Sequence, residues 1–424
     1  SLIMPAHHDS VPEMKVAIIG GGAAGLMAAA ALTEMNPSAD IWLIEKNDGL
    51  GKKVIISGGG RCNVTTGIRD IRTVLTKYPR GTKFLSKAMY AFSPEAVYDW
   101  FEAHGVPMKV EEDLRAFPQS DDGEDVVRAF EYLFSDSSVH VMLKAQVTQV
   151  EKDPGGYKIS FKGNDAPIIV DNVVLTTGGQ AYRHTGSTGD GYAFAMELGH
   201  TITPLAPSLN AFTTKEQWPK TISGLSFEQA TFTAYREKKT TFTGPFLFTH
   251  RGVSGPAVFA LSSLVAFEPY GPNEPLAVTI DLFPNETSTE LSARLMTAIT
   301  NHPKKSMANV LDMLLPKSLV QVVCQETGVS PDRRANEVSK KELAEIMTWL
   351  KNIPLTVIGR DAGDEFVTAG GVSLDEVDPS TMQSKISPGL YFAGEILNID
   401  GFTGGFNLQA SWATGHLAGE SIGH

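Results

Sequence analysis

The sequence predicts an α/β fold in which one domain with a parallel sheet is interrupted by an insertion of strands and helices. Three observations support this. An unbroken apolar run, KVAIIG from Lys15, leads into glycines and an alanine-rich helix, as in a strand buried on both faces. Between about 201 and 284, β-branched and aromatic residues are frequent in runs that are separated by turn-forming residues, as in an all-β segment. PGLYFAGE then returns to strand and loop, and a helix rich in small residues follows.

The first domain opens with a strand, helix, strand unit. The helix LMAAAALTEMN ends at Asn36 and Pro37, and IWLIE has the pattern of a second buried strand. Residues 93–134 look helical and mixed, and the stretch from VHVMLK to ISFKG predicts strands joined by a Gly-Gly turn. DNVVLTTGG repeats the pattern of a buried strand that runs into glycines.

The predicted insertion consists of an all-β part followed by a helical part. After the all-β part, Leu291, Leu295 and Ile299 recur at spacings of four, which predicts helices. We therefore expect a discontinuous first domain at 14–200 and 352–424, an all-β insertion at 201–284 and a helical subdomain at 285–351.

The composition of the chain limits the kinds of partner and site that we expect. The 36 basic and 48 acidic residues give a net charge of −12, which argues against a general nucleic-acid surface and against anionic membranes. Apolar runs end short of the ~18 residues that cross a bilayer. Cys62 and Cys324 stand far apart, so neither a disulfide framework nor a metal site is indicated. We expect a soluble cytoplasmic protein with a small-molecule substrate; its oligomeric state stays open.

Gly20, Gly22 and Gly25 form a G-x-G-x-x-G fingerprint between the first strand and its helix, and Glu45 closes the second strand. In this context Gly20 permits the tight turn, Gly22 lets the backbone approach a pyrophosphate, and Gly25 packs helix on strand. Glu45 would accept hydrogen bonds from a ribose with free hydroxyls, which favours FAD or NAD over NADP. The alternative is a glycine-rich turn beside a solvated glutamate.

The C-terminal motif decides between these cofactors. Glu395 and Asp400 precede Gly404 and Gly405, and a helix starts near Asn407. A helix N-terminus aimed at a flavin would stabilise the negative charge that reduction leaves near N1 and the C2 carbonyl. A nicotinamide has no such requirement, so the sequence favours FAD.

These motifs resemble those of a known family. VAIIGGGAAGL, ISGGGRCNVTT, TGSTGDGYAFA, FTHRGVSGPAVF and GLYFAGEILNIDGFTGGFNLQASWATG together are similar to the aminoacetone-oxidase-like flavoproteins, which include the BaiN-type bile-acid reductases. The resemblance runs from about Met14 to the C-terminus. It implies a two-dinucleotide-binding-domain type of flavoprotein, with a glutathione-reductase-type FAD-binding Rossmann domain interrupted by a β-barrel and a helical insertion.

Carried over by position, the resemblance implies residues for each part of FAD, bound without a covalent link. The pyrophosphate would meet Gly20, Gly22, Ala23, Ala24 and Gly25; the adenosine ribose would meet Glu45 and Lys46, and the adenine Val147. The remaining cofactor-binding positions are Lys53, Ser57, Gly58, Gly59, Arg61, Asn63, Thr177, Gly178, Gly179, Gly394, Glu395, Asp400, Gly404, Gly405, Phe406, Asn407 and Gln409. Two departures from the family pattern, AYRHTGS where a proline usually precedes TGS and Phe406 where tyrosine is common, lie where we expect the substrate face.

The loop from Ser57 to Asn63 would lie along the extended cofactor, where its glycines allow close approach. Arg61 would neutralise a phosphate or orient the flavin edge; a solvated arginine is the alternative. Cys62 is expected to be packed and inert, because a redox thiol needs a resolving cysteine. His184 and His250 are the candidates for proton transfer, against a structural or solvated role for each.

The sequence therefore predicts an FAD-dependent oxidoreductase that transfers a hydride between a small organic substrate and flavin N5. It would be either an oxidase of a small amine or an NAD(P)H-dependent reductase of an activated double bond. A second dinucleotide fingerprint is absent, so any nicotinamide would dock without its own Rossmann unit. The alternatives are an RNA-associated flavoprotein and a non-catalytic FAD-binding partner protein.

Overall fold

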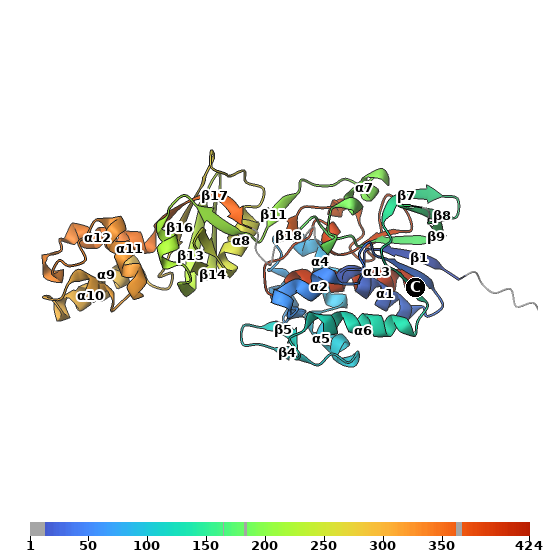
Figure 1. The fold of residues 1–424 in the computed structure, drawn as a ribbon, viewed down its shortest axis with the longest axis horizontal. Coiled ribbons are helices and arrows are strands. Elements are labelled where there is room, and N and C mark those ends of the chain that lie inside the picture. Colours follow the sequence, from blue (N-terminus) through green and yellow to red (C-terminus); the bar gives the residue numbers. More distant parts are fainter. Residues whose placement is uncertain (1–12, 164, 182–184, 362–366) are drawn as a thin grey trace, which may run out of the picture. The chain divides into compact units, whose positions relative to one another are not determined.

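The computed structural model describes residues 13–163, 165–181, 185–361 and 367–424. The chain divides into two compact units (Figure 1). The first unit contains residues 1–207 and 364–424, and the second contains residues 208–363. The first unit is therefore built from two stretches of chain that are separated in sequence by the second.

A five-stranded sheet, in the order β19-β10-β1-β2-β6, forms the centre of the first unit. Its pairings are all parallel. Residues Val16 to Ile19 are buried, as expected for a parallel sheet that is covered on both faces. The strands are β1 (Lys15–Ile19), β2 (Asp40–Ile44), β6 (Val139–Met142), β10 (Asn172–Leu175) and β19 (Leu390–Phe392).

The first and last helices of this unit, α1 (Ala23–Met35) and α13 (Phe406–Gly423), lie side by side (Figure 1). Small residues allow the close approach. A Cβ at Gly415 would lie 2.4 Å from the Ala24 carbonyl oxygen, and one at Gly419 would lie 2.3 Å from that of Ala28. The helix at the end of the sequence thus packs directly on the helix that follows the glycine fingerprint.

Smaller elements complete the first unit. Two three-stranded sheets have the orders β3-β5-β4 and β7-β8-β9, and β11 pairs with β18. The strands are β3 (Thr65–Thr66), β4 (Met108–Val110), β5 (Arg115–Pro118), β7 (Val147–Asp153), β8 (Gly156–Phe161), β9 (Ile168–Val170), β11 (Ala206–Ser208) and β18 (Val367–Ala369). The helices are α2 (Lys52–Ile56), α3 (Ile71–Leu75), α4 (Thr82–Ala91), α5 (Pro94–Ala103), α6 (Gly123–Ser135) and α7 (Asp190–Glu197).

A closed six-stranded barrel in the order β12-β15-β14-β13-β16-β17 forms one part of the second unit. Aromatic side chains such as Phe232, Phe246 and Phe248 fill its interior. The barrel elements are β12 (Ala211–Thr214), β13 (Ser226–Tyr235), β14 (Lys239–Phe248), β15 (Gly252–Ser254), α8 (Pro256–Leu264), β16 (Leu276–Asp281) and β17 (Ile353–Asp361).

Four helices lie to one side of the barrel within this unit (Figure 1). Two of them start with a capping box, Thr287 with Glu290 and Ser339 with Glu342, which satisfies N–H groups at the helix start. The helices are α9 (Ser288–Asn301), α10 (Met307–Leu311), α11 (Lys317–Thr327) and α12 (Lys340–Lys351).

The predicted α/β architecture, interrupted by a barrel and a helical insertion, is confirmed. Two stretches differ from the predicted domain limits. Residues 201–207 were assigned to the all-β insertion, but they belong to the first unit. Residues 352–361 were assigned to the first domain, but β17 pairs with β12 and β16 and closes the barrel, because its alternating apolar side chains point into the barrel core. In the described parts of the chain, no helix has the length and apolarity that a membrane span requires.

Candidate functional site

The three fingerprint glycines between β1 and α1 differ in the space around them. Gly20 has a φ of 114°, and a Cβ there would lie 2.4 Å from the carbonyl oxygen of Thr176. A Cβ at Gly25 would lie 1.8 Å from the carbonyl oxygen of Gly20. At Gly22 a Cβ would meet no atom of the described residues within 4 Å, and Gly22 lines a cavity. The chain therefore needs Gly20 and Gly25 for its own packing, whereas Gly22 leaves space for a ligand.

The N-terminus of α1 faces the same cavity. No side chain of the described residues caps this helix, and its first turn contains no acidic residue. The first N–H groups of a helix have no partner within the helix, and the helix dipole places partial positive charge there. The turn is therefore suited to an anionic group such as a diphosphate.

Glu45, at the end of β2, joins the glycine turn to the next loop. Its carboxylate accepts hydrogen bonds from the N–H of Gly21 at 2.8 Å and the N–H of Asn47 at 2.9 Å. An ionised carboxylate offers about four acceptor positions, so Glu45 can still accept bonds from ligand hydroxyls. Beside it, the Lys46 ammonium donates to Asp190 at 2.9 Å. Both Glu45 and Lys46 line the cavity.

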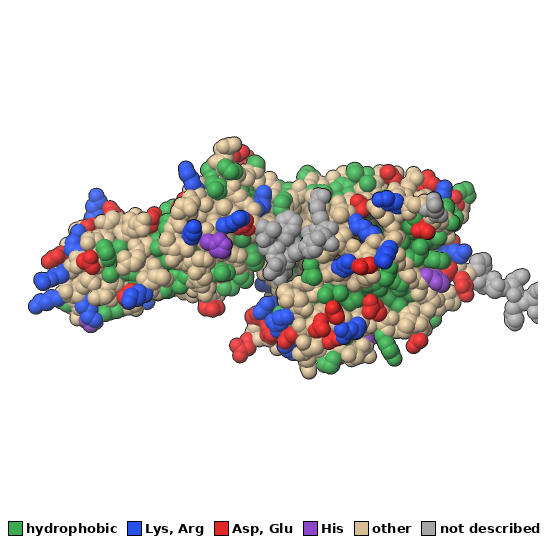
Figure 2. All heavy atoms as spheres, in the orientation of Figure 1, with side chains coloured by type: hydrophobic (Ala, Val, Ile, Leu, Met, Phe, Trp, Pro, Cys, Tyr) green, Lys and Arg blue, Asp and Glu red, His purple; other side chains and the backbone are tan. Residues whose placement is uncertain are grey.

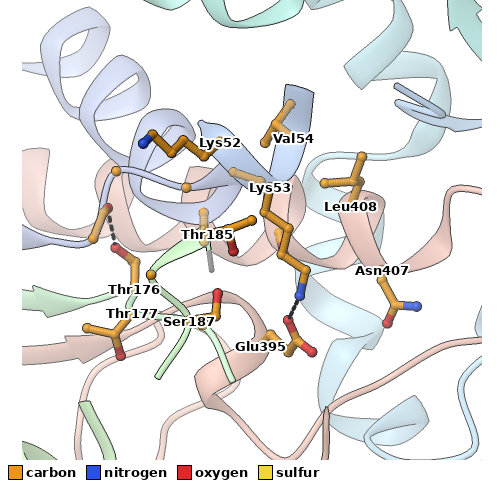
Figure 3. A pocket seen from close by; sticks show the side chains of 18 of the residues that line it. Lys52, Lys53, Val54, Thr176, Thr177, Thr185, Ser187, Glu395, Asn407 and Leu408 are labelled. Carbon is orange, nitrogen blue, oxygen red and sulfur yellow. Dashed lines mark hydrogen bonds and ion pairs between the residues drawn. The ribbon is translucent and has the colours of Figure 1, made fainter. Parts of the chain in front are cut away.

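A second charged pair on the cavity wall comes from the two separate stretches of this unit. The Lys53 ammonium on α2 lies 2.7 Å from a carboxylate oxygen of Glu395 (Figure 3). The other Glu395 oxygen accepts from the N–H of Thr368 at 2.9 Å. Both side chains are mostly shielded from solvent, so the pair fixes a positive and a negative charge at the cavity surface.

The N-terminus of α13 is the second helix start at the cavity. Gly405 precedes it with a φ of 87°, and its first turn has no acidic residue. Within the ranges that the structure describes, no side chain caps it. The Asn407 amide holds the preceding loop, since it accepts from Gly401 N–H at 2.8 Å and donates to Gly401 O at 2.9 Å. The Asn63 amide is best oriented with its oxygen 2.9 Å from the Gly405 nitrogen. The loop at 57–63 is thereby tied to this helix start.

One cavity, with about 1640 Å³ of empty space including its open mouth, connects these groups. Most of the predicted cofactor-binding residues line it. These are Gly20, Gly22, Ala23, Ala24, Glu45, Lys46, Lys53, Ser57, Gly58, Asn63, Val147, Thr177, Gly178, Glu395, Gly404, Gly405 and Asn407.

The other predicted cofactor-binding residues are not among those that line the cavity. They are Gly25, Gly59, Arg61, Gly179, Gly394, Asp400, Phe406 and Gln409. Gly25 and Gly394 allow close packing, since a Cβ at Gly25 would lie 1.8 Å from the Gly20 carbonyl oxygen and one at Gly394 would lie 2.7 Å from the Ala24 Cβ. The direct roles predicted for this group stay predictions.

Arg61 has protein partners instead of an open ligand position. Its guanidinium pairs with the carboxylates of Glu111 and Asp121, the latter at 2.8 Å. It also lies 3.9 Å from the centroid of the Phe117 ring. Arg61 therefore has carboxylate partners in the structure and is not among the residues that line the cavity, and its predicted role toward the cofactor stays a prediction.

Asp400 and Gln409 are buried and bonded within the protein. The Arg80 guanidinium forms a two-pronged ion pair with Asp400, with one contact at 2.5 Å. The Gln409 amide accepts from the Thr65 hydroxyl at 2.6 Å and donates to the Phe92 carbonyl at 2.9 Å. Both residues position the segments beside the cavity.

Cys62 is fully buried and has a φ of 58°. Burial raises the pKa of its thiol to about 12. A thiol with this pKa stays protonated at neutral pH, and the thiolate is the reactive form. These observations support the packed, inert interpretation.

The two histidines proposed for proton transfer receive no support from the described structure. His184 lies outside the described residues. His250 is an exposed residue of the second unit, in the turn after β14. Their catalytic roles stay predictions.

Sequence reasoning missed several cavity-lining residues. The loop TGSTGDG contributes Thr185, Gly186, Ser187 and Asp190, and its glycine content was an available signal that the absence of a full fingerprint obscured. Asn47 donates from its amide to the Thr185 carbonyl at 2.6 Å. The apolar members Ile399, Phe402 and Leu408 had no sequence signal that separates them from core residues.

The residues present fit FAD. The open space at Gly22, two uncapped helix starts at one cavity and the free acceptor capacity of Glu45 match a ligand with a diphosphate, a ribose and a second anionic region. Thr177 adds a buried hydroxyl without a hydrogen-bond partner among the described residues. The fold and this site define an FAD-binding Rossmann protein of the FAD-dependent oxidoreductase class.

The particular family is shown by comparison with known proteins. The model of the HI0933-like protein Rossmann domain matches residues 14–421, and the chain belongs to this family. The resemblance to BaiN-type and aminoacetone-oxidase-like flavoproteins is thereby confirmed.

Two relatives match nearly full length. The chain is 29% identical over 409 residues to the 3-dehydro-bile acid delta(4,6)-reductase of Clostridium scindens, covering 96% of this chain and 98% of the relative. It is 30% identical over 410 residues to the ribosomal RNA dihydrouridine synthase of Haemophilus influenzae, with 96% and 97% covered. Among solved structures, FrdA of Escherichia coli quinol fumarate reductase shares the fold, with a TM-score of 0.50, 16% identity, and 97% and 70% of the two chains covered.

Proposed function

We propose that this protein reduces a carbon–carbon double bond conjugated to a carbonyl group, with a reduced nicotinamide as the source of electrons. The observation that carries the proposal is the shared chemistry in the names of two relatives. One name describes a reductase of double bonds in a 3-oxo compound, and the other describes the saturation of the uracil ring. Both reactions add two hydrogens to an alkene that a carbonyl activates.

FAD, when bound and reduced, supplies a hydride in such a reaction. The carbon β to the carbonyl gains this hydride, and the α carbon gains a proton. NAD(P)H loses one hydride per turnover, so one NAD(P)H and one proton are consumed for each alkene saturated. Of the two versions left open by the sequence, this is the reductase rather than the amine oxidase.

Residues of this chain would bind and orient the reactants. The α1 start and Gly22 would hold the diphosphate, and Glu45 would accept from the ribose. The N-terminus of α13 would stabilise negative charge on the reduced ring system. The ion pair of Lys53 with Glu395 would hold one positive and one negative charge in fixed positions at the cavity surface.

The test is anaerobic turnover with paired substrates. The FAD-loaded protein is mixed with NADH or NADPH and either an α,β-unsaturated ketone, its saturated counterpart or a small primary amine. We expect nicotinamide oxidation with the enone and none with the saturated ketone. Bleaching of the flavin by the amine, with no reduction by either nicotinamide, would show an oxidase and overturn the proposal.

A further inference from the structure

Charged side chains on the cavity wall fall into separate groups. Among the described residues, those that line the cavity are Glu45, Lys46, Lys52, Lys53, Asp190 and Glu395. Lys46 and Asp190 pair with each other beside Glu45, at the end of the cavity that we assign to the ribose. Lys52 pairs with Asp48, and both of these side chains are largely open to water. The pair of Lys53 with Glu395 belongs to neither group.

Both members of the Lys53–Glu395 pair are connected to the start of α13. The N–H of Gly394, next to Glu395, donates to the Thr414 hydroxyl on α13 at 2.9 Å. Lys53 lies on α2, which leads into the loop at 57–63, and that loop is tied to the α13 start. Figure 3 shows Lys53 pointing toward Glu395, and the first turn of α13 contributes to the same cavity wall. The pair therefore lies at the end of the cavity that the diphosphate and ribose leave for the flavin ring system.

The Glu395 carboxylate is held in place by several neighbours. One of its oxygens lies 2.7 Å from the Lys53 ammonium, and the other accepts from the N–H of Thr368 at 2.9 Å. A Cβ at Gly179 would lie 3.3 Å from that second oxygen, so the backbone packs close to it. The Thr368 hydroxyl in turn accepts from the N–H of Gln180 at 3.0 Å. These contacts fix the carboxylate, and the carboxylate fixes the ammonium that pairs with it.

The two charges of this pair are partly shielded from water. The exposed fractions of the Lys53 and Glu395 side chains are 28% and 15%, compared with 39% and 42% for Lys158 and Glu151, a surface pair of the same unit. Figure 2 shows positive and negative side chains interspersed over the visible face of the first unit, where water and salt screen them. A charge in a cavity with less water acts more strongly on its neighbours, because the effective dielectric constant is lower.

The nearby hydroxyl of Tyr192, on α7, adds no third charge. Burial, and in second place the Glu395 carboxylate, raises the pKa of this hydroxyl, so it is neutral at physiological pH. Among the described residues it has no hydrogen-bond partner. The electrostatic field at this end of the cavity therefore comes from Lys53, Glu395 and the start of α13.

We propose that Lys53 and Glu395 set the reduction potential of the bound flavin, and that their effects have opposite signs. Two-electron reduction leaves negative charge near N1 and the C2 carbonyl of the ring system. The Lys53 ammonium stabilises this charge and raises the potential, whereas the Glu395 carboxylate destabilises it and lowers the potential. The inference requires bound FAD, and it does not depend on which substrate the protein reduces or oxidises.

The alternative role is a structural tie that only joins α2 to the segment after β19. Loss of such a tie would weaken the fold, or would weaken the binding of oxidised and reduced FAD by the same factor. A pair that acts on the charge of the ring changes the affinity for one oxidation state relative to the other. By linkage, the ratio of these two affinities changes by the same factor as the equilibrium between oxidised and reduced flavin. The two roles therefore predict different measurements.

The test compares single variants of the FAD-saturated protein. Lys53→Met and Glu395→Gln each remove one charge of the pair and keep a side chain of similar length. As controls, Lys158→Met and Glu151→Gln remove the same charges from the surface pair, in which the ammonium and carboxylate lie 3.3 Å apart. The reduction potential is measured by equilibration with a redox dye at pH 7. Urea unfolding and flavin absorbance check that each variant is folded and loaded.

We expect Lys53→Met to lower the ratio of reduced to oxidised flavin at a fixed dye potential by at least about tenfold, a fall of ~30 mV for a two-electron couple. Glu395→Gln should raise this ratio by at least about tenfold. The controls should stay within about twofold of the unchanged protein, because exposed charges are screened. The double variant of Lys53 and Glu395 should lie between the two single variants. Shifts of the same sign in both single variants, or shifts no larger than those of the controls, would overturn the proposal.

A second measurement separates this role from a loss of binding or folding. Each apoprotein is titrated anaerobically with oxidised FAD and with FAD reduced by dithionite. In Lys53→Met the affinity for reduced FAD should fall about tenfold more than the affinity for oxidised FAD. Lys53→Arg keeps the positive charge, and its potential should stay within about twofold of the unchanged protein in the dye equilibrium even where its FAD affinity falls. Equal losses of affinity for both forms of FAD would show that the pair is only a structural tie.

Discussion

Replacing Gly22 by alanine should weaken FAD binding and leave the fold nearly intact, whereas replacing Gly25 by alanine should destabilise the fold. In the described part of the chain, no atom lies within 4 Å of a Cβ built at Gly22, and the residue has a φ of −85° that alanine can adopt. The folded apoprotein should therefore lose only about 0.5–1 kcal/mol, which is the difference between glycine and alanine at a helix N-cap. Because the methyl group would enter the cavity, FAD affinity should fall at least about 100-fold, or ~2.7 kcal/mol.

Gly25→Ala should instead destabilise the apoprotein. Its Cβ would lie 1.8 Å from a backbone oxygen of Gly20, so helix and turn would have to move apart. Overpacking costs about 1–3 kcal/mol and occasionally more, and a contact this short with a backbone atom should place Gly25→Ala at the upper end of that range. Urea unfolding of the two apoproteins and FAD titration by quenching of flavin fluorescence measure both quantities. Wild-type FAD affinity in a stable Gly22→Ala protein would refute the assignment of the diphosphate to this turn.

Three further results are expected. The folded-state pKa of the Cys62 thiol is about 12 and its unfolded value is near 9, so the contribution of this thiol to stability is fully present below pH 9. Between pH 9 and pH 12 the free energy of unfolding should fall by up to about 1.4 kcal/mol per pH unit, because only the unfolded chain releases this proton. Cys62→Ala should remove that part of the pH dependence in urea titrations. Asp400→Asn, which leaves the Arg80 guanidinium without its carboxylate, should lower the free energy of unfolding by about 3 kcal/mol; a loss below 1 kcal/mol would show that the pair does not position this loop. Insertion of one glycine after Gly405 should shift the start of α13 and lower the flavin reduction potential by a few tens of millivolts in dye equilibration, and an unchanged potential with FAD bound would exclude this helix from tuning the flavin.

The local parts of the site could be predicted from the sequence. The turn at Gly20, its helix and Glu45 depend on short-range spacing, and the structure places them as the fingerprint implies. The resemblance added Lys53 and Val147, which also line the cavity.

The sequence could not predict which side chains far apart in the chain would pair with one another. Arg80 finds Asp400 at a separation of 320 residues, and Thr65 finds Gln409 at 344. A motif shows that Asp400 or Gln409 has a constrained role, but it does not distinguish a cofactor contact from an internal hydrogen bond. Arg61 illustrates the same limit, since its carboxylate partners are supplied by distant loops.

Because the first unit consists of two separate stretches of chain, it can be completed only after the second unit has been synthesised. On a ribosome, the sheet must wait for β19 and the cavity must wait for Glu395 and α13, which are synthesised after the whole barrel and its helices. The second unit has its own core and is continuous in sequence, so it can fold while the first is still incomplete. A nascent chain therefore passes through a stage with a finished insertion and an open sheet edge beside β10, and FAD gains its full site only when the last helix packs onto the first.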